Sequence, residues 1–281
     1  MEPRIRELDC TGRIVTLDRP RIMGVLNVTP DSFYDGGQWL GVDEAIRHAL
    51  LMQEEGADMI DVGGESTRPG AQAVPLQQEL DRVIPVIEAI APRLTVPVSI
   101  DTRKPEVMRE AVAAGAGMIN DVFALQCDGA VQAAADLAVP VCLMHMQRGP
   151  RVMQDSPDYN DVAQEVRQFL LQRAKHCEEN SILPKNIVLD PGFGFGKSLQ
   201  HNIKLFHALP SLVATGYPIL LGVSRKTMIG QLTGRETAGR MPGSITAAAL
   251  AVLQGAVIVR VHDVAATRDA LKVATALVTA A

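Results

Sequence analysis

The chain has 281 residues, of which 47% are hydrophobic and 21% are charged, and its formal net charge is -5. This balance is typical of a globular protein with a large core and excludes an extensively disordered chain. The negative net charge argues against a nucleic-acid or membrane surface, so an anionic ligand would have to be held by a local cluster of Arg, Lys or His side chains.

The two ends of the chain contain no stretch that resembles a targeting or membrane segment. The first residues lack the apolar core of a secretory signal. The most apolar late stretch, residues 247–261, is interrupted by Gln254, Gly255 and Arg260 and is too short and polar to span a bilayer. We therefore expect a soluble, cytoplasmic protein. The four cysteines show neither zinc-ligand spacing nor a disulfide pattern.

The chain begins with a segment, residues 4–18, that alternates loosely and turns at Thr11-Gly12, which predicts an N-terminal β-hairpin within residues 1–20. Eight short apolar runs follow, and helical periodicity separates them. The runs begin near residues 21, 58, 96, 117, 140, 186, 218 and 256. The expected helices cover 42–50, 76–94, 105–115, 130–138, 161–180, 202–215, 245–254 and 264–279.

Near-continuous apolar strands joined by helices indicate a parallel sheet covered on both faces. Eight such units favour an α/β fold with a closed (β/α)8 TIM barrel, and a doubly wound open sheet is the alternative. No composition shift or low-complexity linker marks a second domain. We expect one domain over 1–281, with the hairpin in 1–20 and the barrel in 21–281.

Polar residues follow every apolar run, at the strand ends where barrels of this type place their catalytic groups. The residues at these strand ends are Asn27, Asp61, Asp101, Asn120, Met144, Asp190, Lys226, Arg260 and His262, all of them polar except Met144. Any one acid or amide could simply cap the next helix. Capping does not explain why several acids coincide with Arg68, Lys226, Arg260 and His262 on one rim. Carboxylates and an amide suit a planar, donor-rich heterocycle, and the cations suit an anionic group beside it.

Three weaker patterns are discounted. Gly192, Gly194 and Gly196 lack the spacing of a phosphate loop or a dinucleotide fingerprint, so they predict flexibility around Phe195. His145 is expected to be a satisfied side chain of the inner rim rather than a metal ligand. The stretch 222–226 is not the Gly-x-Ser-x-Gly elbow of a serine hydrolase.

Seven motifs in order resemble those of the dihydropteroate synthase family, the folate-pathway enzymes that sulfonamides target. They are GVLNVTPDSF (24–33), IDVGGESTRPG (60–70), SIDT (99–102), IND (119–121), LDPGFGFGK (189–197), GVSRK (222–226) and RVHD (260–263). Tyr34 stands where serine is common in related chains, and residues 122–125 match no motif. Both departures lie outside the residues expected to bind pterin.

The resemblance implies that 6-hydroxymethyl-7,8-dihydropterin diphosphate is condensed with 4-aminobenzoate to give 7,8-dihydropteroate and pyrophosphate. It places the pterin on Asp101, Asn120, Asp190 and Lys226, with Asp61 and Met144 nearby. Asn27 would bind Mg²⁺, and the diphosphate would lie on Asn27, Arg68, Arg260 and His262. The implied 4-aminobenzoate pocket comprises Phe33, Thr67, Pro69, Phe195, Ser224, Arg225 and Lys226. The residues expected to be catalytic are Asn27, Asp101, Lys226, Arg260 and His262.

The general barrel rule would instead put phosphate on the loops after strands seven and eight. The family resemblance assigns Lys226, after strand seven, to the pterin. The pterin methylene carries a good leaving group, so we expect an SN1-like path in which Asp101 stabilises the developing cation. Residues 29–37 are expected to form a mobile lid that carries Phe33.

The resemblance also implies a homodimer and sulfonamide inhibitors as ligands. The apolar helix 245–253 could supply the dimer interface, or its side chains could pack in the core. Two other functions remain open at this point. One is a methyltetrahydrofolate corrinoid methyltransferase, which has a similar pterin-binding barrel and transfers a methyl group to a corrinoid. The residues expected to bind diphosphate argue against it. The other is a non-catalytic paralogue that binds pterin or a partner protein.

Overall fold

The computed structural model of the protein describes residues 7–28, 38–66, 72–147 and 157–279. The predicted N-terminal hairpin is present as the antiparallel pair β1 (Glu7–Cys10) and β2 (Arg13–Thr16). Its two turn residues, Thr11 and Gly12, have φ of 56° and 85°. Positive φ at both positions is what a two-residue turn needs to match the twist of its strands.

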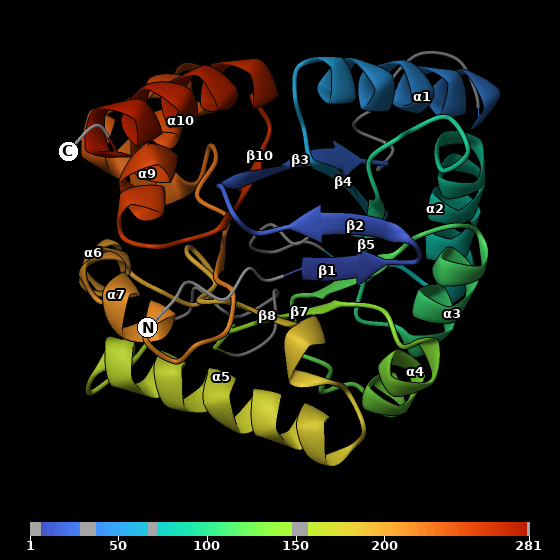
Figure 1. Ribbon diagram of the computed structural model, residues 1–281, viewed down its shortest axis with the longest axis horizontal. Coiled ribbons are helices and arrows are strands. Elements are labelled where there is room, and N and C mark those ends of the chain that lie inside the picture. The colour runs from blue at the N-terminus through green and yellow to red at the C-terminus, as the bar shows by residue number, and fades with distance from the viewer. Residues whose placement is uncertain (1–6, 29–37, 67–71, 148–156, 280–281) are drawn as a thin grey trace.

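Eight parallel strands form the barrel (Figure 1). They are β3 (Arg21–Asn27), β4 (Met59–Gly63), β5 (Val98–Asp101), β6 (Met118–Asp121), β7 (Val141–Met144), β8 (Ile187–Asp190), β9 (Leu220–Leu221) and β10 (Ile258–Val261). β3 to β8 pair in chain order, and β10 lies between β3 and β9. A parallel bridge from Leu189 to Ile219, just before β9, joins the two edges of the sheet. The predicted TIM barrel with its hairpin is confirmed.

The surrounding helices follow the predicted segments with two differences. They are α1 (Gln38–Glu54), α2 (Leu76–Ile90), α3 (Pro105–Ala113), α4 (Ala130–Leu137), α5 (Val162–Glu179), α6 (Leu199–His207), α7 (Leu209–Val213), α8 (Thr227–Thr233), α9 (Met241–Leu253) and α10 (Val264–Thr279). The single helix expected over 202–215 is wrong, because it divides into α6 and α7 at Ala208. Pro210 has no N–H and its ring would clash with the carbonyl of Phe206 in one continuous helix. The short helix α8 was not predicted.

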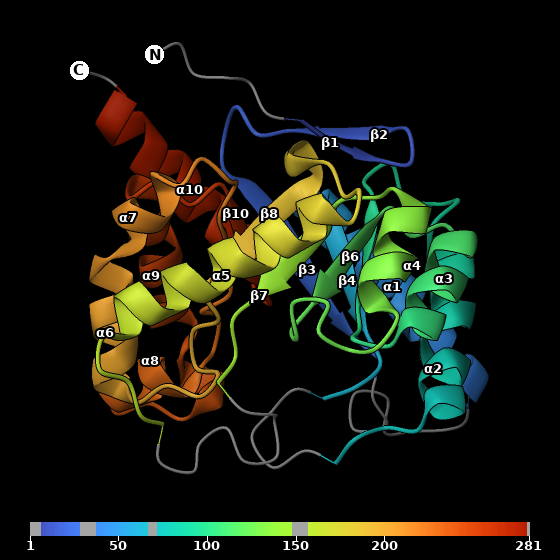
Figure 2. The same ribbon diagram turned by 90° about the horizontal axis from the view of Figure 1, so that it is seen from below.

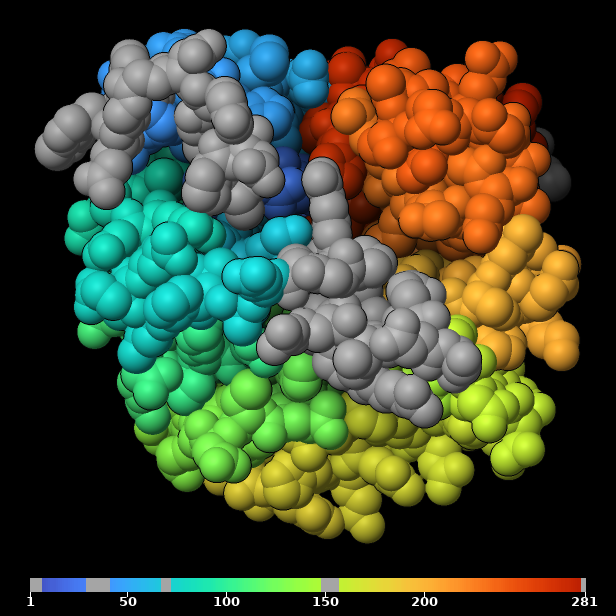
Figure 3. Space-filling model, turned by 180° about the vertical axis from the view of Figure 1, so that it is seen from behind, coloured from blue at the N-terminus to red at the C-terminus, as the bar shows by residue number. Residues whose placement is uncertain are grey.

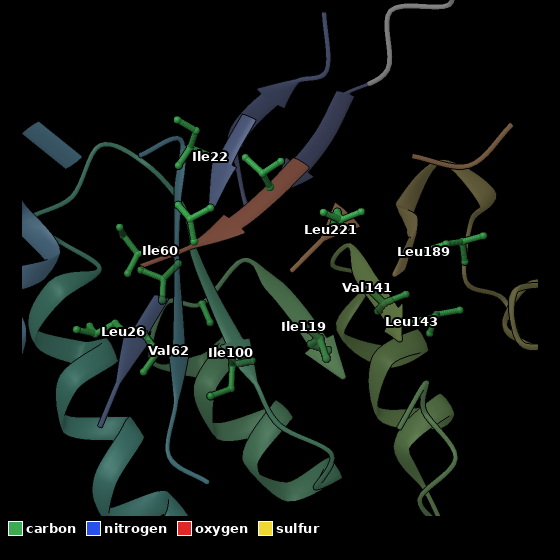
Figure 4. Packing of buried hydrophobic residues seen from close by; sticks show 14 of the residues in the cluster. Ile22, Leu26, Ile60, Val62, Ile100, Ile119, Val141, Leu143, Leu189 and Leu221 are labelled. Atoms are coloured by element: carbon green, nitrogen blue, oxygen red, sulfur yellow. The ribbon is translucent and has the colours of Figure 1, made fainter. Parts of the chain in front are cut away.

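The strands separate two apolar layers, because successive side chains point to opposite faces. One layer lies between the strands and the helices, and Figure 4 labels ten of its members, from Ile22 to Leu221. The other fills one end of the barrel interior with side chains such as Met23, Met59 and Met118. The alternation therefore decides which strand residues face the inside of the barrel.

The hairpin closes the amino-terminal end of the barrel. Leu8, Cys10 and Val15 pack into the same cluster as the interior side chains Met59 and Cys142. Figure 2 shows the hairpin lying across one end of the barrel, away from the carboxyl ends of the strands. Figure 3 shows the opposite face, where the barrel segments succeed one another around a ring in chain order. No helix within the described ranges is long and apolar enough to cross a membrane.

Candidate functional site

The polar residues at the strand ends face the interior of the barrel, above its apolar floor. On β6, Met118 belongs to the interior cluster and Ile119 to the outer one, so Asn120 points inward again. Its neighbour Asp121 is turned to the outer side, where its carboxylate accepts hydrogen bonds from the N–H groups of Phe123 (2.7 Å) and Leu125 (2.8 Å). Two adjacent polar residues thus have different tasks, since one lines the interior and the other shapes a loop.

Arg260 lies at the centre of a buried polar network in the barrel interior. Its Nε donates to Asp61 Oδ2 (2.6 Å), and one terminal N–H group donates to Asp101 Oδ2 (2.8 Å). Asn120 Nδ2 donates to the same Asp61 oxygen at 3.0 Å. Within the described part of the chain, the buried Asp61 Oδ1 has no hydrogen-bond partner. β4, β5, β6 and β10 are therefore joined through one guanidinium and two carboxylates.

The charges of this network shift the pKa values of its members. Burial raises the pKa of the Asp101 carboxyl to about 7. The positive charge of Arg260 opposes this rise in pKa, and the negative charge of Asp61 adds to it. Burial also works against the charged form of Arg260, but Asp61 and Asp101 outweigh it and hold the pKa of the guanidinium above its usual value. Asp101 therefore changes charge near neutral pH, whereas Arg260 remains positive.

A second charged pair, Asp190 and Lys226, lies on the same rim. Burial lowers the pKa of Lys226 to about 7, although Asp190 opposes the shift. Burial likewise raises the pKa of Asp190, whose carboxylate accepts from the N–H of Gly192 at 2.7 Å. The Lys226 ammonium donates to the carbonyl of Phe193 and lies 4.0 Å from the centre of the Phe195 ring. Lys226 is thus held against an aromatic ring.

Steric constraints that the sequence did not reveal explain why glycines occupy three positions of the loop after β8. Gly192, Gly194 and Gly196 have φ of 69°, 78° and 61°. A Cβ on Gly192 would lie 1.9 Å from the carbonyl oxygen of His145, and one on Gly196 would lie 2.6 Å from that of Gln147. Close backbone approach and positive φ, rather than flexibility around Phe195, account for these residues.

Side-chain contacts join the loops that follow β9 and β10. His262 Nδ1 lies 3.0 Å from Ser224 Oγ, which also accepts from the His262 backbone N–H at 3.2 Å. Arg225 makes two hydrogen bonds with the carboxylate of Asp263, one of them 3.0 Å long. Arg225 has a φ of 57°, and Ser244 accepts from its N–H at 2.9 Å. The two loops therefore behave as one unit at the rim.

The structure brings many of the predicted site residues together around one pocket, but not all of them. A pocket at the rim is lined by Asp101, Asn120, Met144, Asp190, Phe195, Ser224, Lys226, Arg260 and His262, as the sequence led us to expect. Its apolar side also includes Val25, Val122 and Gly222, which were not predicted. Val25 and Gly222 could have been identified from the sequence, because every second residue along β3 and β9 faces the barrel interior. Asp61 is fully buried beneath the pocket, and Arg225 points toward Asp263.

Some predicted residues do not contribute to this pocket. Asn27 is exposed at the end of β3. Phe33, Thr67, Arg68 and Pro69 lie outside the described residues, as do Tyr34 and the expected lid 29–37. Where the structure describes the chain, no three His, Cys, Asp or Glu side chains are grouped so that they could hold a metal ion.

Comparison with known proteins agrees with this geometry. A family model described as pterin binding enzyme matches residues 23–262. The dihydropteroate synthase of Escherichia coli (strain K12) is 49% identical over 274 residues, which cover 98% of this chain and 97% of that protein. The structure of Xanthomonas albilineans dihydropteroate synthase with 4-aminobenzoic acid is 56% identical, with a TM-score of 0.93 and 99% of each chain covered. The same enzyme in complex with 7,8-dihydropteroate is 53% identical, with a TM-score of 0.89, covering 98% of this chain and 99% of that one.

Proposed function

The chain belongs to the dihydropteroate synthase family of pterin-binding enzymes, and from this premise we propose which of its residues carry the reaction. The family's transferase activity in folate biosynthesis joins 6-hydroxymethyl-7,8-dihydropterin diphosphate to 4-aminobenzoate. The observation that carries the residue assignment is the pocket at the rim, where Asp101, Asn120, Asp190 and Lys226 surround one space with apolar side chains between them.

The pterin ring lies deep in this pocket. Asp101 and Asp190 accept from its amino and ring N–H groups, because ionised carboxylates offer acceptors only. Asn120 donates one amide proton to Asp61 and also lines the pocket, while Lys226 donates to a ring oxygen or nitrogen. Met144 and Val122 supply the apolar contacts for the faces of the ring.

The diphosphate lies toward the outside of the rim. Arg260 and His262 are the described basic side chains on this side of the pocket, and Arg68 is assigned to the same group by family resemblance. Mg²⁺ binds through one or two protein oxygens together with substrate phosphate oxygens and water. The amide oxygen of the exposed Asn27 suits such a site, which needs no cluster of acidic ligands. Bound there, Mg²⁺ would neutralise charge on the diphosphate.

The reaction breaks the bond between the pterin methylene carbon and the diphosphate oxygen, and the electron pair leaves with pyrophosphate. The resulting cation is delocalised into the pterin, where the Asp101 carboxylate stabilises it. Arg260 and His262 stabilise the departing pyrophosphate. The neutral arylamine nitrogen then forms the new bond to carbon and loses a proton. No strong base is required, because the arylamine is already uncharged near neutral pH.

The 4-aminobenzoate lies above the pterin, between the loops after β8 and β9. Phe195, Ser224 and Lys226 line the described part of this pocket. Phe33, Thr67, Pro69 and Arg225 complete it by family resemblance. Sulfonamides have the same shape and compete for this subsite.

The assay that tests the function mixes the purified protein with the dihydropterin diphosphate, 4-aminobenzoate and Mg²⁺, and measures pyrophosphate and dihydropteroate. Both products should form in equal amounts, and chelation of Mg²⁺ should abolish them. Tight pterin binding without product would favour a non-catalytic paralogue. Methyl transfer from methyltetrahydrofolate to a corrinoid would favour the methyltransferase.

The pH dependence should reflect Asp101 and Lys226. As the pH falls through about 7, Asp101 gains a proton and loses the charge that stabilises the cation. As the pH rises through about 7, Lys226 loses a proton and the charge that binds the pterin. The profile of kcat/KM for the dihydropterin diphosphate should therefore be a narrow bell. Asp101→Asn should remove its acid limb, and an acid limb that persists in this variant would contradict the assignment.

We propose that the protein is a homodimer that pairs through α9 and α10. These helices lie side by side (Figure 1) and expose Leu250 and Leu253 on α9, at 48% and 46%, and Val273 and Leu277 on α10. Apolar side chains gathered in this way on a surface are typical of an interface. A second copy of the chain is the occupant that the family resemblance implies.

The double variant Leu250→Glu/Leu253→Glu should convert a dimer into a monomer. Pairing of two such subunits would bury four carboxylates against apolar side chains, and burying an unpaired charge is unfavourable. Light scattering during size exclusion measures the mass directly. Leu183→Glu is the matched control, since Leu183 is equally exposed (54%) but lies before β8, away from α9. A wild-type protein that elutes as a monomer at every concentration would overturn the proposal.

A further inference from the structure

Lys197 is a buried lysine that the proposed mechanism does not use. It ends the loop after β8, its side chain is only 3% exposed, and it does not line the pocket. Its Nζ lies 2.8 Å from the carbonyl oxygen of Gly192, 3.0 Å from that of Phe195 and 3.0 Å from His145 Nδ1. A lysine is almost never fully buried unless its charge is paired and hydrogen-bonded, so its position needs a reason.

The three shortest contacts match the three protons of an ammonium group, and a fourth acceptor, the carbonyl oxygen of His145, lies 3.4 Å from Nζ. A neutral amine has two protons, and its lone pair would face one of the three acceptors. The imidazole of His145 must then accept at Nδ1, and burial together with the charge of Lys197 lowers the pKa of His145 to about 2. Burial also lowers the pKa of Lys197, while Asp190 opposes this shift. The ammonium is therefore surrounded by acceptors, with a carboxylate nearby.

Lys197 supports only part of the loop after β8, namely the turn around Phe195 and not the start of the loop at Asp190. Asp190 is fixed without it, because its carbonyl accepts from the His145 N–H at 2.9 Å and its side chain accepts from Gly192 N–H. Phe195 lies beyond two glycines with positive φ, and its N–H makes a 3.2 Å hydrogen bond to Gly192. The two closest carbonyl groups that Lys197 binds, those of Gly192 and Phe195, therefore belong to the turn that presents Phe195, and the third, that of His145, is more distant at 3.4 Å.

We propose that Lys197 is a positioning residue that holds Phe195 in place through the carbonyl oxygens of Gly192 and Phe195, and so shapes the wall of the 4-aminobenzoate pocket. This inference rests on the proposed function of that pocket. Loss of the ammonium should loosen the Phe195 ring, whereas the Lys226 ammonium keeps its own hydrogen bond to the carbonyl of Phe193. The pterin site should remain, because Asp190 and Asp101 are held by other contacts.

The test compares Lys197→Met with wild type in steady-state assays that vary each substrate in turn. Met has nearly the same length but donates no hydrogen bond, and the KM for 4-aminobenzoate should rise about tenfold. The KM for the dihydropterin diphosphate and kcat should change by less than about threefold. Lys197→Gln, which can donate two protons, should fall between Met and wild type. Lys204→Met is the matched control on α6, because Lys204 is exposed, and it should behave as wild type.

A selective rise in one KM is not expected from general destabilisation, which would lower the active fraction and hence the apparent kcat. An unchanged KM for 4-aminobenzoate in a folded Lys197→Met variant would overturn the proposal, and so would equal rises in both KM values. Thermal unfolding shows whether the variant folds, and if it does not, the same comparison in Lys197→Gln decides. A wild-type protein that forms no dihydropteroate would instead refute the proposed function.

Discussion

Replacing Asp101 by Asn should lower kcat for dihydropteroate formation by about 10²-fold to 10³-fold, the usual loss when one preorganised electrostatic contact to a transition state is removed. The amide retains the shape of the side chain and can still accept a hydrogen bond from Arg260, which now donates to Asp101 at 2.8 Å. What disappears is the full negative charge beside the developing pterin cation. Arg260 keeps Asp61 as its second partner, so the fold of the network should survive.

Oxygen isotope exchange within the dihydropterin diphosphate makes this prediction specific to bond cleavage. A heavy oxygen placed between the methylene carbon and phosphorus should move to a nonbridging position when the carbon–oxygen bond breaks, the released phosphoryl group rotates and another of its oxygens re-forms the bond. Wild type should show this exchange, and Asp101→Asn should show much less of it. Asp128→Asn, an exposed acid in the loop before α4, is the control. Unchanged pyrophosphate release in Asp101→Asn would refute the proposed role.

Gly192→Ala should lower the free energy of unfolding far more than Gly234→Ala, although the two glycines have nearly the same φ. Gly192 and Gly234 have nearly identical φ, 69° and 68°. A Cβ on Gly234 would meet no atom within 4 Å, whereas one on Gly192 would lie 1.9 Å from the His145 carbonyl oxygen. Gly234→Ala should therefore cost only the strain of positive φ, about 1–2 kcal/mol. Gly192→Ala adds an overpacking cost of about 1–3 kcal/mol.

Urea unfolding of the two variants measures the difference directly, because the pair isolates the steric contact from the backbone preference. Gly192→Ala should also raise the KM for 4-aminobenzoate, since its carbonyl is one of the acceptors that Lys197 binds. Equal losses of stability in the two variants would show that the loop after β8 can move away from His145. That result would also weaken the case for a rigid Phe195.

The fold was largely predictable because a parallel barrel repeats one simple pattern. Apolar runs at short intervals predict the strands, and the rule that catalytic groups follow strand ends predicts Asp101, Asn120 and Asp190 as neighbours. Pro210 could have predicted the break between α6 and α7, because proline cannot continue a helix. The helix α8 has only seven residues with Gly230 among them, which is too short for a periodic pattern.

The contacts within the site could not be predicted, because they join residues far apart in the chain. Arg260 pairs with Asp61 and Asp101, which lie 199 and 159 residues away. Lys197 follows a glycine-rich stretch and has the sequence context of an exposed loop, yet it is buried against His145. The glycines before it suggest flexibility when only their sequence is known. Only the position of the neighbouring carbonyl shows that they are required by close packing.

Among the described residues, the hairpin closes the base of the barrel and leaves the rim as its opening. Leu8, Cys10 and Val15 seal one end against the interior side chains. Everything that reaches the interior must therefore pass the rim, and whatever lies deepest must arrive first and leave last. If 4-aminobenzoate occupies the level of Phe195, above the level of Asp101, it blocks the route of a pterin that has not yet entered. On the proposed assignment of the two subsites, we therefore expect the dihydropterin diphosphate to bind before the arylamine.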